Sequence, residues 1–329
     1  MTAISHRFYW ITLIAGLMSC SEQRAEHFEL SNADAAGSPH NLEQFFAGRF
    51  YLVKKGGTIT RAPVAKPLQR GFGLSVVQTR REKGDWIGIT PSGYHVRLHD
   101  LEQARPSSFA GVVLPNGHLD QGWVVQPHAP VFSAPSLGAQ RVRKKDRLAL
   151  VHLVSHDGPK GYYRIGEGWM QDTALAIPTL AARPADVGPR EAWIDVDLRS
   201  QTLVAYQGNQ PLFATLISAG VGAPGTVFAT PVGNHRIQSK LLKATMDNLS
   251  HVGVIPYYYE EVPFVQYIGR VALHGIYWHD GFGQRRSHGC INLSVRDARW
   301  LFTFTKPDLP QGVTEIAAGE KGGTVVRVR

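Results

Sequence analysis

The sequence predicts a mainly β protein that contains more than one domain. Its 329 residues correspond to about two domains, at roughly 150 residues for each. The 34 glycines and 20 prolines are typical of short strands joined by many turns, and they argue against a helical bundle or a coiled coil. Because 43% of the residues are hydrophobic, the chain can form sizeable cores, which excludes disorder along its whole length.

The charge and the cysteine count restrict the partners and the chemistry. The chain has 35 Lys and Arg against 26 Asp and Glu, which gives a net charge of +9. This excess favours anionic surroundings such as nucleic acid, lipid headgroups or cell-wall polymer, and charge alone does not choose among them. The two cysteines, Cys20 and Cys290, are too few for a disulfide framework, so we expect each to have its own chemistry.

The first 20 residues predict an export signal. His6 and Arg7 precede an apolar run over 8–18, which is too short to cross a bilayer of about 30 Å and has the length of a signal-peptide core. The run ends in the sequence LMSC, which resembles the bacterial lipobox. This resemblance implies that Cys20 is lipidated and anchors the protein at a membrane surface without a spanning helix. The alternative is an ordinary signal that is cleaved nearby.

The residues after the lipobox predict the location of the anchor and a tether. Ser21, not Asp, follows Cys20, which in enteric-type bacteria implies the outer membrane, with the protein in the periplasm. Residues 21–40 are mostly polar, with Phe28 as their single aromatic residue. We therefore expect a flexible tether over 21–47.

Two small β modules are predicted before the C-terminal part of the chain. Over 48–104, short apolar stretches such as FYLV at 50–53 are broken by turns, and a similar arrangement recurs over 122–177. Both segments resemble bacterial SH3-like modules, which are small barrels common in cell-wall enzymes. One irregular β domain is the alternative. The basic run over 141–147 is interpreted as a solvated loop, with contact to the cell wall or to phospholipid as the alternative.

A new domain is predicted after the proline-rich segment 178–190. Its first residues, 193–206, alternate apolar and polar side chains around a turn, as the two strands of a half-buried hairpin do. Ser294 resembles a helix N-cap with Asp297 three residues later, and the apolar positions that follow recur at helical spacing. The end of the chain, 323–328, is typical of another short strand.

Two motifs in this domain carry the chemistry. An apolar run ends at His274, and thirteen residues later comes the sequence SHGCIN over 287–292. A cysteine nucleophile must be a thiolate, and the free pKa of about 8.5 is too high for that at neutral pH, so a nearby imidazole has to take the proton. Either His274 or His288 can be this base. The spacing favours His274, because His288 is two residues from Cys290 and such tight spacing rarely allows a free mutual geometry.

These motifs resemble the catalytic domain of the YkuD-type L,D-transpeptidases. The resemblance covers about residues 191–320, and the sequence IDVDLRSQTLVAYQGN and the hairpin at Thr230 support it. It implies a β-sandwich with short helices. It also implies that Cys290 is the nucleophile, that His274 is its general base, and that the backbone carbonyl of Gly275 orients the imidazole.

The same resemblance assigns roles to the residues around the nucleophile. The N–H groups of Gly289 and Cys290 would form the oxyanion hole, because glycine leaves its backbone open to a substrate. Three side chains would shape the substrate pocket: Ser287, His288 and Asn292. Many members of the family have Arg in place of Asn292, so the resemblance leaves the substrate contacts there open.

The resemblance also implies a mobile lid before the catalytic histidine, often with an aromatic hydroxyl. Three residues lie in the corresponding region: Tyr257, Tyr258 and Tyr259. The sequence does not distinguish between them. Zinc is a further alternative for the histidines and Cys290, but their spacing does not resemble a standard structural site. His279 by itself is interpreted as a surface or structural residue.

The activity that the resemblance implies is that of an L,D-transpeptidase of peptidoglycan. Cys290 would attack the carbonyl of the L-centre of diaminopimelate in a tetrapeptide stem and expel D-Ala. The thioester would then pass to an amine, either of another stem or of a wall-attached protein. No metal, organic cofactor or nucleic-acid partner is implied.

Two other functions remain open from the sequence. One is a murein peptidase or amidase of the same fold, in which water is the acceptor. The other is a non-enzymatic protein whose SH3-like modules bind peptidoglycan and whose C-terminal domain is inactive. The presence of both His274 and Cys290 argues against the second of these.

Overall fold

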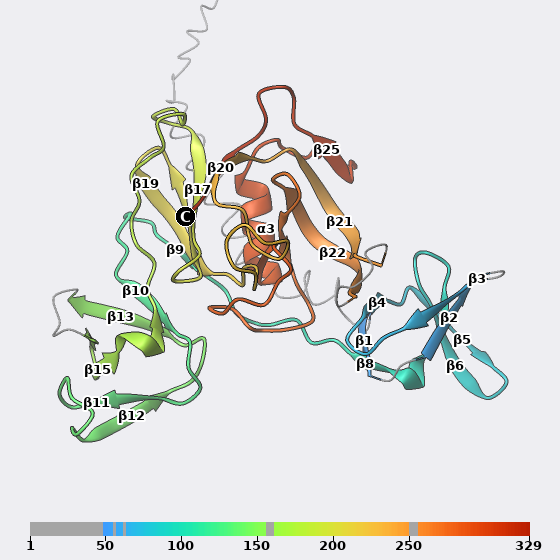
Figure 1. The fold of residues 1–329 in the computed structure, drawn as a ribbon, viewed down its shortest axis with the longest axis horizontal. Helices are drawn as coiled ribbons and strands as arrows, with labels where there is room; N and C mark the ends of the chain where they lie inside the picture. Colours follow the sequence, from blue (N-terminus) through green and yellow to red (C-terminus); the bar gives the residue numbers. More distant parts are fainter. Residues whose placement is uncertain (1–48, 55–56, 62–63, 156–160, 250–255) are drawn as a thin grey trace, which may run out of the picture.

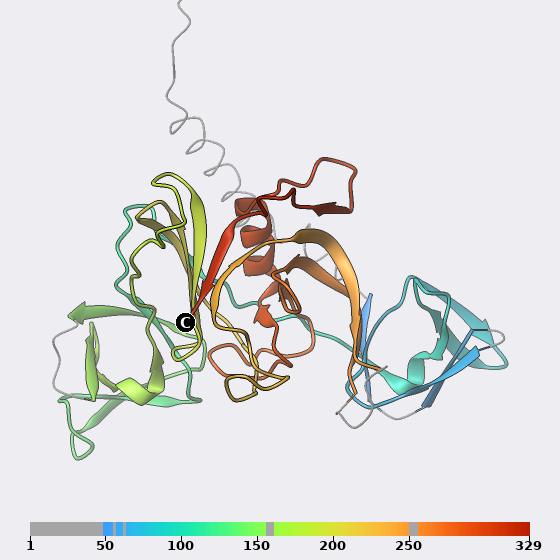
Figure 2. The same ribbon diagram turned by 45° about the horizontal axis from the view of Figure 1, so that its top comes forward.

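The computed structural model describes residues 49–54, 57–61, 64–155, 161–249 and 256–329. The predicted signal with Cys20 and the predicted tether lie outside these residues. Within them the fold is mainly β, as predicted, with α3 (Val295–Phe304) as the single α-helix, and no helix there is long and apolar enough to cross a membrane. Two small modules lie on opposite sides of the C-terminal domain (Figures 1 and 2).

The first module is built from short antiparallel strands. These are β1 (Phe50–Val53), β2 (Gly57–Arg61), β3 (Val64–Leu68), β4 (Gly73–Ser75), β5 (Gln78–Glu82), β6 (Asp85–Ile89), β7 (His95–Arg97) and β8 (Leu101–Gln103). β1 pairs with β4 and with β8, and a short 3-10 turn over Leu98–Asp100 precedes β8. Leu74, Val76 and Val96 belong to its apolar core.

The second module repeats this pairing scheme. Its strands are β10 (Gln121–Val124), β11 (Ala129–Phe132), β12 (Arg141–Lys145), β13 (Leu150–Ser155), β14 (Tyr162–Ile165), β15 (Gly168–Gln171) and β16 (Leu175–Ala176). β10 pairs with β13 and with β16, and a 3-10 turn again precedes the last strand. The repeated topology agrees with the internal repeat seen in the sequence, while the likeness to SH3-like modules stays a prediction.

One sheet of the C-terminal domain contains the hairpin predicted from the sequence. β17 (Ala192–Asp197), β18 (Thr202–Gln207) and β19 (Gln210–Leu216) form an antiparallel meander, and β26 (Val325–Val328) pairs in parallel with β17 and antiparallel with β20 (Gly233–Arg236). β26 therefore lies inside the sheet. The domain boundary expected at residue 320 is wrong, because the final strand is needed to complete this sheet.

The second sheet carries the motifs. β22 (Tyr258–Tyr267) pairs with β21 (Ser239–Asp247) and β23 (Ala272–Gly275), and β23 pairs in parallel with β24 (Ile291–Leu293), while β25 (Glu315–Ala317) lies beside β21. The helix α3 packs on β22 and β23, and its Trp300 stacks on Phe213 of β19 at 4.2 Å between ring centroids. α3 thus lies between the two sheets, as Figure 1 shows.

The modules are joined to the C-terminal domain through strands and hydrogen bonds. β4 of the first module forms a parallel bridge with β22, between Gly73 and Tyr259, so the second sheet continues into that module. β9 (Val112–Val113), in the segment between the modules, pairs with the outer strand β19. The first module and the segment between the modules therefore add strands to the two sheets of the C-terminal domain, whereas the strands of the second module form a sheet of their own.

The start of α3 follows the predicted cap, with one difference. Ser294 Oγ accepts the Asp297 N–H at 3.1 Å, so the N-cap is confirmed. The Asp297 carboxylate does not close a capping box, however, because it accepts the Gly111 N–H at 2.8 Å and the Thr215 hydroxyl at 2.6 Å. Burial raises the pKa of Asp297 to about 6, and these hydrogen bonds oppose the shift. This carboxylate ties the helix to the segment between the modules.

Candidate active site

Two neighbouring strands bring the two sequence motifs together. In the parallel pair β23–β24, His274 lies opposite Asn292 and Gly275 lies opposite Leu293. Cys290 directly precedes β24 and packs against the cluster that contains Val262 and Ala272. Cys290 thus lies level with Ala272, two positions before His274 on the neighbouring strand, although fifteen residues separate His274 from Cys290 in the chain.

His274 has the tautomer that a general base needs. Its Nδ1 lies 3.1 Å from the carbonyl oxygen of Gly275, and a carbonyl only accepts, so Nδ1 carries the proton and Nε2 is the open acceptor. Burial lowers the pKa of His274 to about 4, against the effect of the Gly275 hydrogen bond. The imidazole is therefore neutral at pH 7. The contact with Gly275 is the one that the resemblance implies, and its part in catalysis stays a prediction.

The Cys290 thiol is protonated in this resting arrangement. Burial raises the pKa of the thiol above its ordinary value, while a backbone hydrogen bond from Ala272 and the charge of Arg270 act in the opposite direction. A neutral thiol beside a neutral imidazole needs proton transfer before it can attack a carbonyl. The electrostatics thus require a base at this site.

The turn before Cys290 is braced by hydroxyl groups. Gly289 has φ +122°, and its N–H donates to Ser287 Oγ at 3.1 Å, while Ser287 Oγ donates to the Cys290 carbonyl. Thr230 Oγ1 donates to the Gly289 carbonyl at 2.8 Å and accepts the Gly220 N–H at 2.9 Å. The hairpin noted at Thr230 therefore supports the backbone of the nucleophile.

In this turn, two of the expected site residues pair with each other, and their expected roles toward a substrate stay predictions. The Gly289 N–H was expected in the oxyanion hole, but here it is already paired with Ser287. Ser287 was expected to shape the substrate pocket, but its side chain is buried and its hydroxyl is used within the turn. Both residues hold the backbone around Cys290 in this structure.

The His288 ring contacts two aromatic side chains. Phe228 lies at 4.9 Å in an edge arrangement and Tyr257 at 4.8 Å in a tilted one. Burial lowers the pKa of His288. His288 is therefore part of an aromatic cluster two residues before Cys290, whereas the ring of His274 is oriented by a backbone carbonyl, and the choice of His274 as the base stays a prediction.

The three tyrosines of the expected lid point to different places. Tyr257 contacts His288, and burial followed by the nearby Cys290 raises its pKa to about 12. Tyr258 belongs to the core of the first module and donates to Glu260 Oε1 at 2.9 Å. Tyr259 stacks on Trp278 at 3.8 Å. Of the three, the structure places Tyr257 beside the motif that contains Cys290.

The comparison with known families decides the identity of this part of the chain. The family model of the YkuD L,D-transpeptidase catalytic domain matches residues 191–328. Residues 191–328 form a YkuD L,D-transpeptidase catalytic domain. The match ends with β26, in agreement with the corrected boundary. No curated protein matches the chain.

Solved L,D-transpeptidases are similar to part of the chain. A mutant L,D-transpeptidase of Enterococcus faecium is 24% identical, with a TM-score of 0.32, over 42% of this chain and 50% of the other. The E. faecium catalytic domain acylated by ertapenem is 26% identical (TM-score 0.31; 43% and 98% covered). L,D-transpeptidase 1 of Mycobacterium tuberculosis is 20% identical (TM-score 0.29; 42% and 60% covered). The chain thus spans half of the first relative's length.

The catalytic domain places a second histidine beside Asn292. His279 Nδ1 accepts the Gly281 N–H at 3.0 Å, and its Nε2 lies 3.4 Å from Nδ2 of the Asn292 side-chain amide. Since Nδ1 accepts, the neutral ring carries its proton on Nε2, and a hydrogen bond forms when the Asn292 amide is turned so that its oxygen, not its nitrogen, faces the ring. Burial, together with the charge of Arg286, lowers the pKa of His279 to about 4.

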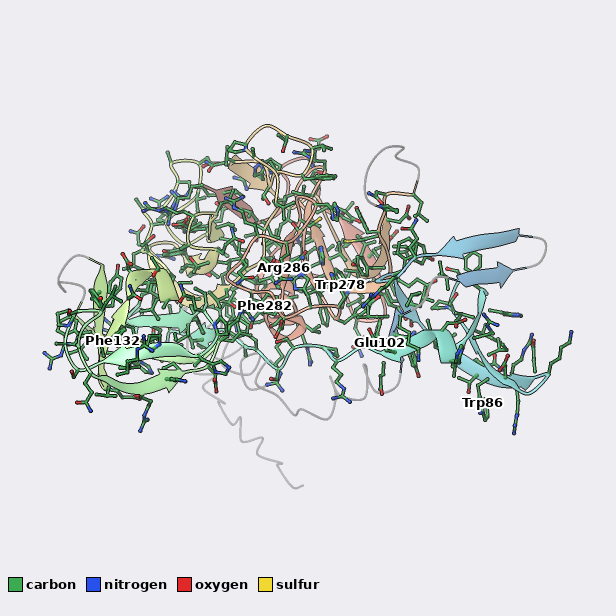
Figure 3. The ribbon with its side chains drawn as sticks, turned by 60° about the horizontal axis from the view of Figure 1, so that its bottom comes forward. Trp86, Glu102, Phe132, Trp278, Phe282 and Arg286 are labelled. Carbon is green, nitrogen blue, oxygen red and sulfur yellow. The ribbon has the colours of Figure 1, made fainter. Side chains whose placement is uncertain are left out.

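No signal in the sequence marks this pair. From the sequence, His279 by itself is interpreted as a surface or structural residue. Only the register of β23 and β24 shows that the loop turns back over Asn292. Asn292 was expected to touch substrate, and the structure adds His279 as its partner. In Figure 3, Trp278, Phe282 and Arg286 mark this loop between the modules.

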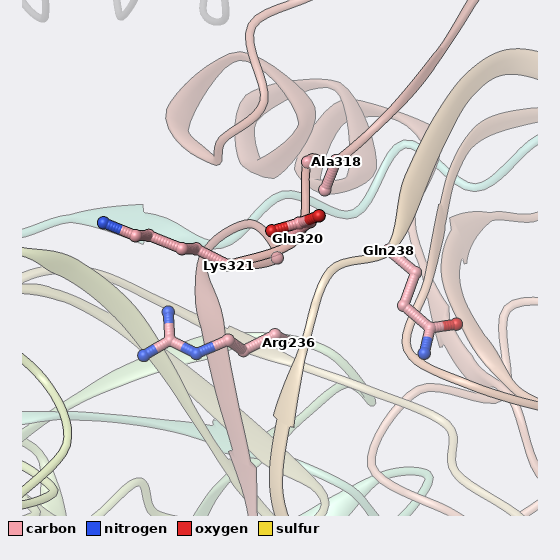
Figure 4. A pocket seen from close by; sticks show the side chains of 7 residues that line it. Arg236, Gln238, Ala318, Glu320 and Lys321 are labelled. Atoms are coloured by element: carbon pink, nitrogen blue, oxygen red, sulfur yellow. The ribbon is translucent and has the colours of Figure 1, made fainter.

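A polar pocket elsewhere in the catalytic domain takes no part in this site. It is lined by Arg236, Gln238 and residues 318–322, after β25 and beside β20 (Figure 4). None of its residues belongs to the segment 271–293. Among the described residues, no group of three or more His, Cys, Asp or Glu side chains could hold a metal ion.

Proposed function

We propose that this protein is a peptidoglycan L,D-transpeptidase that works through an acyl-enzyme on Cys290. One observation carries the proposal within the matched catalytic domain. His274, with Nδ1 held by the Gly275 carbonyl and Nε2 open, lies on the strand next to the one that Cys290 begins. This is a base of the right tautomer beside a thiol that needs one.

The acylation step follows from these protonation states. His274 Nε2 takes the thiol proton as Cys290 Sγ attacks the carbonyl of the L-centre of diaminopimelate in a tetrapeptide stem. The C–N bond to D-Ala then breaks, and the imidazolium returns the proton to the leaving amine. Since burial lowers the pKa of His274 to about 4, the imidazolium is a strong acid here and releases that proton readily.

The transfer step reverses the roles. An amine of another stem or of a wall-attached protein attacks the thioester, His274 accepts the proton of that amine, and the C–S bond breaks. The thiolate is then protonated again, and a new amide has formed. The wall formed around Cys290 by Tyr257, His288 and Phe228 is suited to limit the access of water to the thioester.

The location completes the proposal. We propose that Cys20 carries the lipid anchor, that the catalytic domain acts in the periplasm at the outer membrane, and that the two modules are SH3-like. The lipobox sequence supports the anchor, and the repeated strand pairing supports the relation between the modules.

Mass spectrometry of a defined tetrapeptide muropeptide tests the function. The purified chain should release D-Ala and give a cross-linked product with an added amine, and Cys290→Ala should give neither. A tripeptide product without any amine adduct would identify a hydrolase that uses water. No change in the muropeptide on a folded protein would contradict both activities.

A further inference from the structure

The loop between the base and the nucleophile is held from outside the catalytic domain. Arg147, which follows β12 of the second module, donates from Nη1 to the Asp280 carbonyl at 2.9 Å and from Nη2 to the Phe282 carbonyl. Its side chain is 18% exposed. One guanidinium thus bridges two carbonyls of a loop that runs from β23 to β24.

This contact separates Arg147 from the rest of the basic run. Arg143 and Lys145 pair with Glu167 within the second module, and Arg143 is 65% exposed. Within the described part of the chain, Arg147 pairs with the carboxylate of Asp280, which lies 3.8 Å away and is mostly exposed. The loop expected over 141–147 is wrong for 141–145, which form β12; Arg143 of this strand is exposed, as expected of a solvated run, whereas Arg147 is not.

The loop is also packed against the second module at the same place. Phe282 is fully buried and stacks on Phe109 at 5.5 Å, which in turn meets Trp123 of β10 edge-on. Gly283 has φ +82° and donates to the Ile217 carbonyl at 2.8 Å. A side chain there would collide with Val125 of the second module, because a Cβ would lie 2.5 Å from its Cγ1. The loop is therefore confined between that module and β19.

The confined residues also carry the second histidine. His279 directly precedes Asp280, whose carbonyl accepts a hydrogen bond from Arg147. The N–H of Gly281, the residue after Asp280, donates to His279 Nδ1. Arg147 therefore binds the same short segment that orients the His279 ring. His279 then meets Asn292, which lies opposite His274 in the strand pair. A displacement of the two carbonyls would move His279 away from Asn292.

We propose that Arg147 is a positioning residue for the catalytic centre. By holding the carbonyls of Asp280 and Phe282, it fixes His279 against Asn292, beside the base and the nucleophile. The second module is then a working part of the active site in addition to any contact it makes with the cell wall. This inference rests on the proposed function, because it takes Cys290 as the nucleophile.

The guanidinium is suited to this task for a chemical reason. It is a planar fork with several donors in fixed directions, whereas the ammonium of lysine is a point donor that cannot hold two carbonyls in the same geometry. A misplacement of about 1 Å in a catalytic group can cost up to about 100-fold in rate. Loss of the fork should therefore change the rate far more than it changes the stability.

The test compares variants of the full chain in their rate of Cys290 acylation by a carbapenem. Arg147→Ala should lower this rate by about 10-fold to 100-fold. Arg147→Lys should give a smaller loss, since it retains the charge and one donor. Arg143→Ala is the matched control, because it removes an exposed arginine of the same run, and its rate should equal that of the wild type.

A second measurement distinguishes positioning from a general loss of stability. NMR of the His279 ring should show that its pKa rises in Arg147→Ala, because the loop opens and a nearby positive charge is lost. The other charged or titratable groups that act on His279 are Arg286, Asp280 and His274, and these remain in the variant. A lower melting temperature with an unchanged His279 pKa and an unchanged rate would overturn the proposal.

The remaining outcomes are also decisive. If Arg147→Ala does not fold, Arg147→Lys decides the matter: a slower folded enzyme supports the proposal, and a wild-type rate with a wild-type His279 pKa overturns it. Failure of the proposed function looks different, because the wild type itself would then form no adduct that depends on Cys290.

Discussion

Tyr257 and His288 lie ring against ring, with 4.8 Å between their centroids, next to Cys290, the proposed nucleophile, which follows two residues after His288. Burial and the neighbouring Cys290 raise the pKa of Tyr257 to about 12, so its hydroxyl stays neutral and can donate a hydrogen bond over the physiological range of pH. This contact joins the start of β22 to the turn before β24, and it favours Tyr257 as the source of the aromatic hydroxyl that the sequence could not assign.

Tyr257→Phe should lower the rate of Cys290 acylation several-fold, because the stacked ring is kept and only the hydroxyl is lost. Tyr258→Phe is the matched control, since Tyr258 donates to the buried Glu260 and lies in the first module's core. The control should lower the free energy of unfolding by about 1–3 kcal/mol, with little effect on the rate. A larger loss of rate in Tyr258→Phe than in Tyr257→Phe would assign the lid hydroxyl to the other tyrosine.

His274→Asn should slow alkylation of Cys290 at pH 7 by about 100-fold or more, because the thiol loses its base. Burial lowers the pKa of His274 to about 4, so the imidazole is neutral above that pH. Protonation of His274 should therefore slow the wild-type reaction only as the pH falls to about 4. In the variant, the pH profile should move upward towards the raised pKa of the isolated thiol. His288→Asn serves as the comparison, and the base is His288 if that variant alone moves the profile.

A carbapenem should form a covalent adduct on Cys290, detected by intact-mass measurement. Its ring is a strained amide whose carbonyl resembles the acyl donor, and opening it leaves a thioester. A transferase needs a thioester that water attacks slowly, so the adduct should persist for the proposed function and should be lost quickly from a hydrolase. Cys290→Ala should carry no adduct. Absence of an adduct on the folded wild type contradicts the nucleophile assignment.

Glu261→Gln should weaken the attachment of the first module at neutral pH. Glu261 of β22 accepts both arms of Arg49, at 2.9 Å each, together with the Ser75 hydroxyl and Lys243. Burial alone would raise the pKa of Glu261, but these donors and positive charges outweigh it and lower the pKa below its ordinary value. The loss of stability at pH 7 should be about 1–3 kcal/mol.

The pH dependence of this variant follows from the sign of the shift. A carboxylate whose pKa is lowered by folding contributes stability above its unfolded pKa, and that contribution is lost as the pH falls through the folded value. Thermal melts of wild type and Glu261→Gln should therefore differ at pH 7 and converge in acid below about pH 4. A constant difference across this range would show that the charge of Glu261 does not carry the effect.

Cys20→Ala should move the mature protein from the membrane fraction to the soluble or uncleaved fraction. The reason is chemical, since only a thiol can receive the acyl-glyceryl group that the lipobox implies. Labelling of cells with radioactive palmitate measures it directly. Labelling that is equal in the wild type and the variant would leave Cys20 without this role.

Some features of the fold could be predicted because their causes are local. The cap at Ser294 depends on a hydroxyl three residues before an amide, and the hairpin of β17 and β18 depends on alternation around a turn. The C-terminal limit of the catalytic domain could not be predicted in this way. β26 joins β17 across 130 residues of chain, and no short-range pattern in 323–328 shows that this strand enters the middle of the sheet.

The residues of the candidate site also differ in whether the sequence could identify them. His274 and Cys290 could be named from the sequence, because nucleophile and base chemistry limits the residue types and the flanking glycines mark their backbone. His279 could not be named from the sequence, because its contact with Asn292 depends on the parallel register of β23 and β24. These two strands are connected by residues 276–290, which have no regular structure that a pattern could reveal. The contact of the Gly289 N–H could not be predicted for a similar reason, because the rotamer of Ser287 decides it.

By itself, the sequence determined the β class, the helix cap and the two motifs that carry the chemistry, because each depends on neighbours within a few residues. Only the tertiary structure decided that Tyr257 lies beside the turn that contains Cys290, while Tyr258 packs in the core of the first module. It also decided that Arg147 binds the loop that contains His279. Successive side chains of a strand point to opposite faces, and which face meets which partner is set by the packing of the modules. That packing depends on contacts between residues more than a hundred positions apart, as between Arg147 and Asp280.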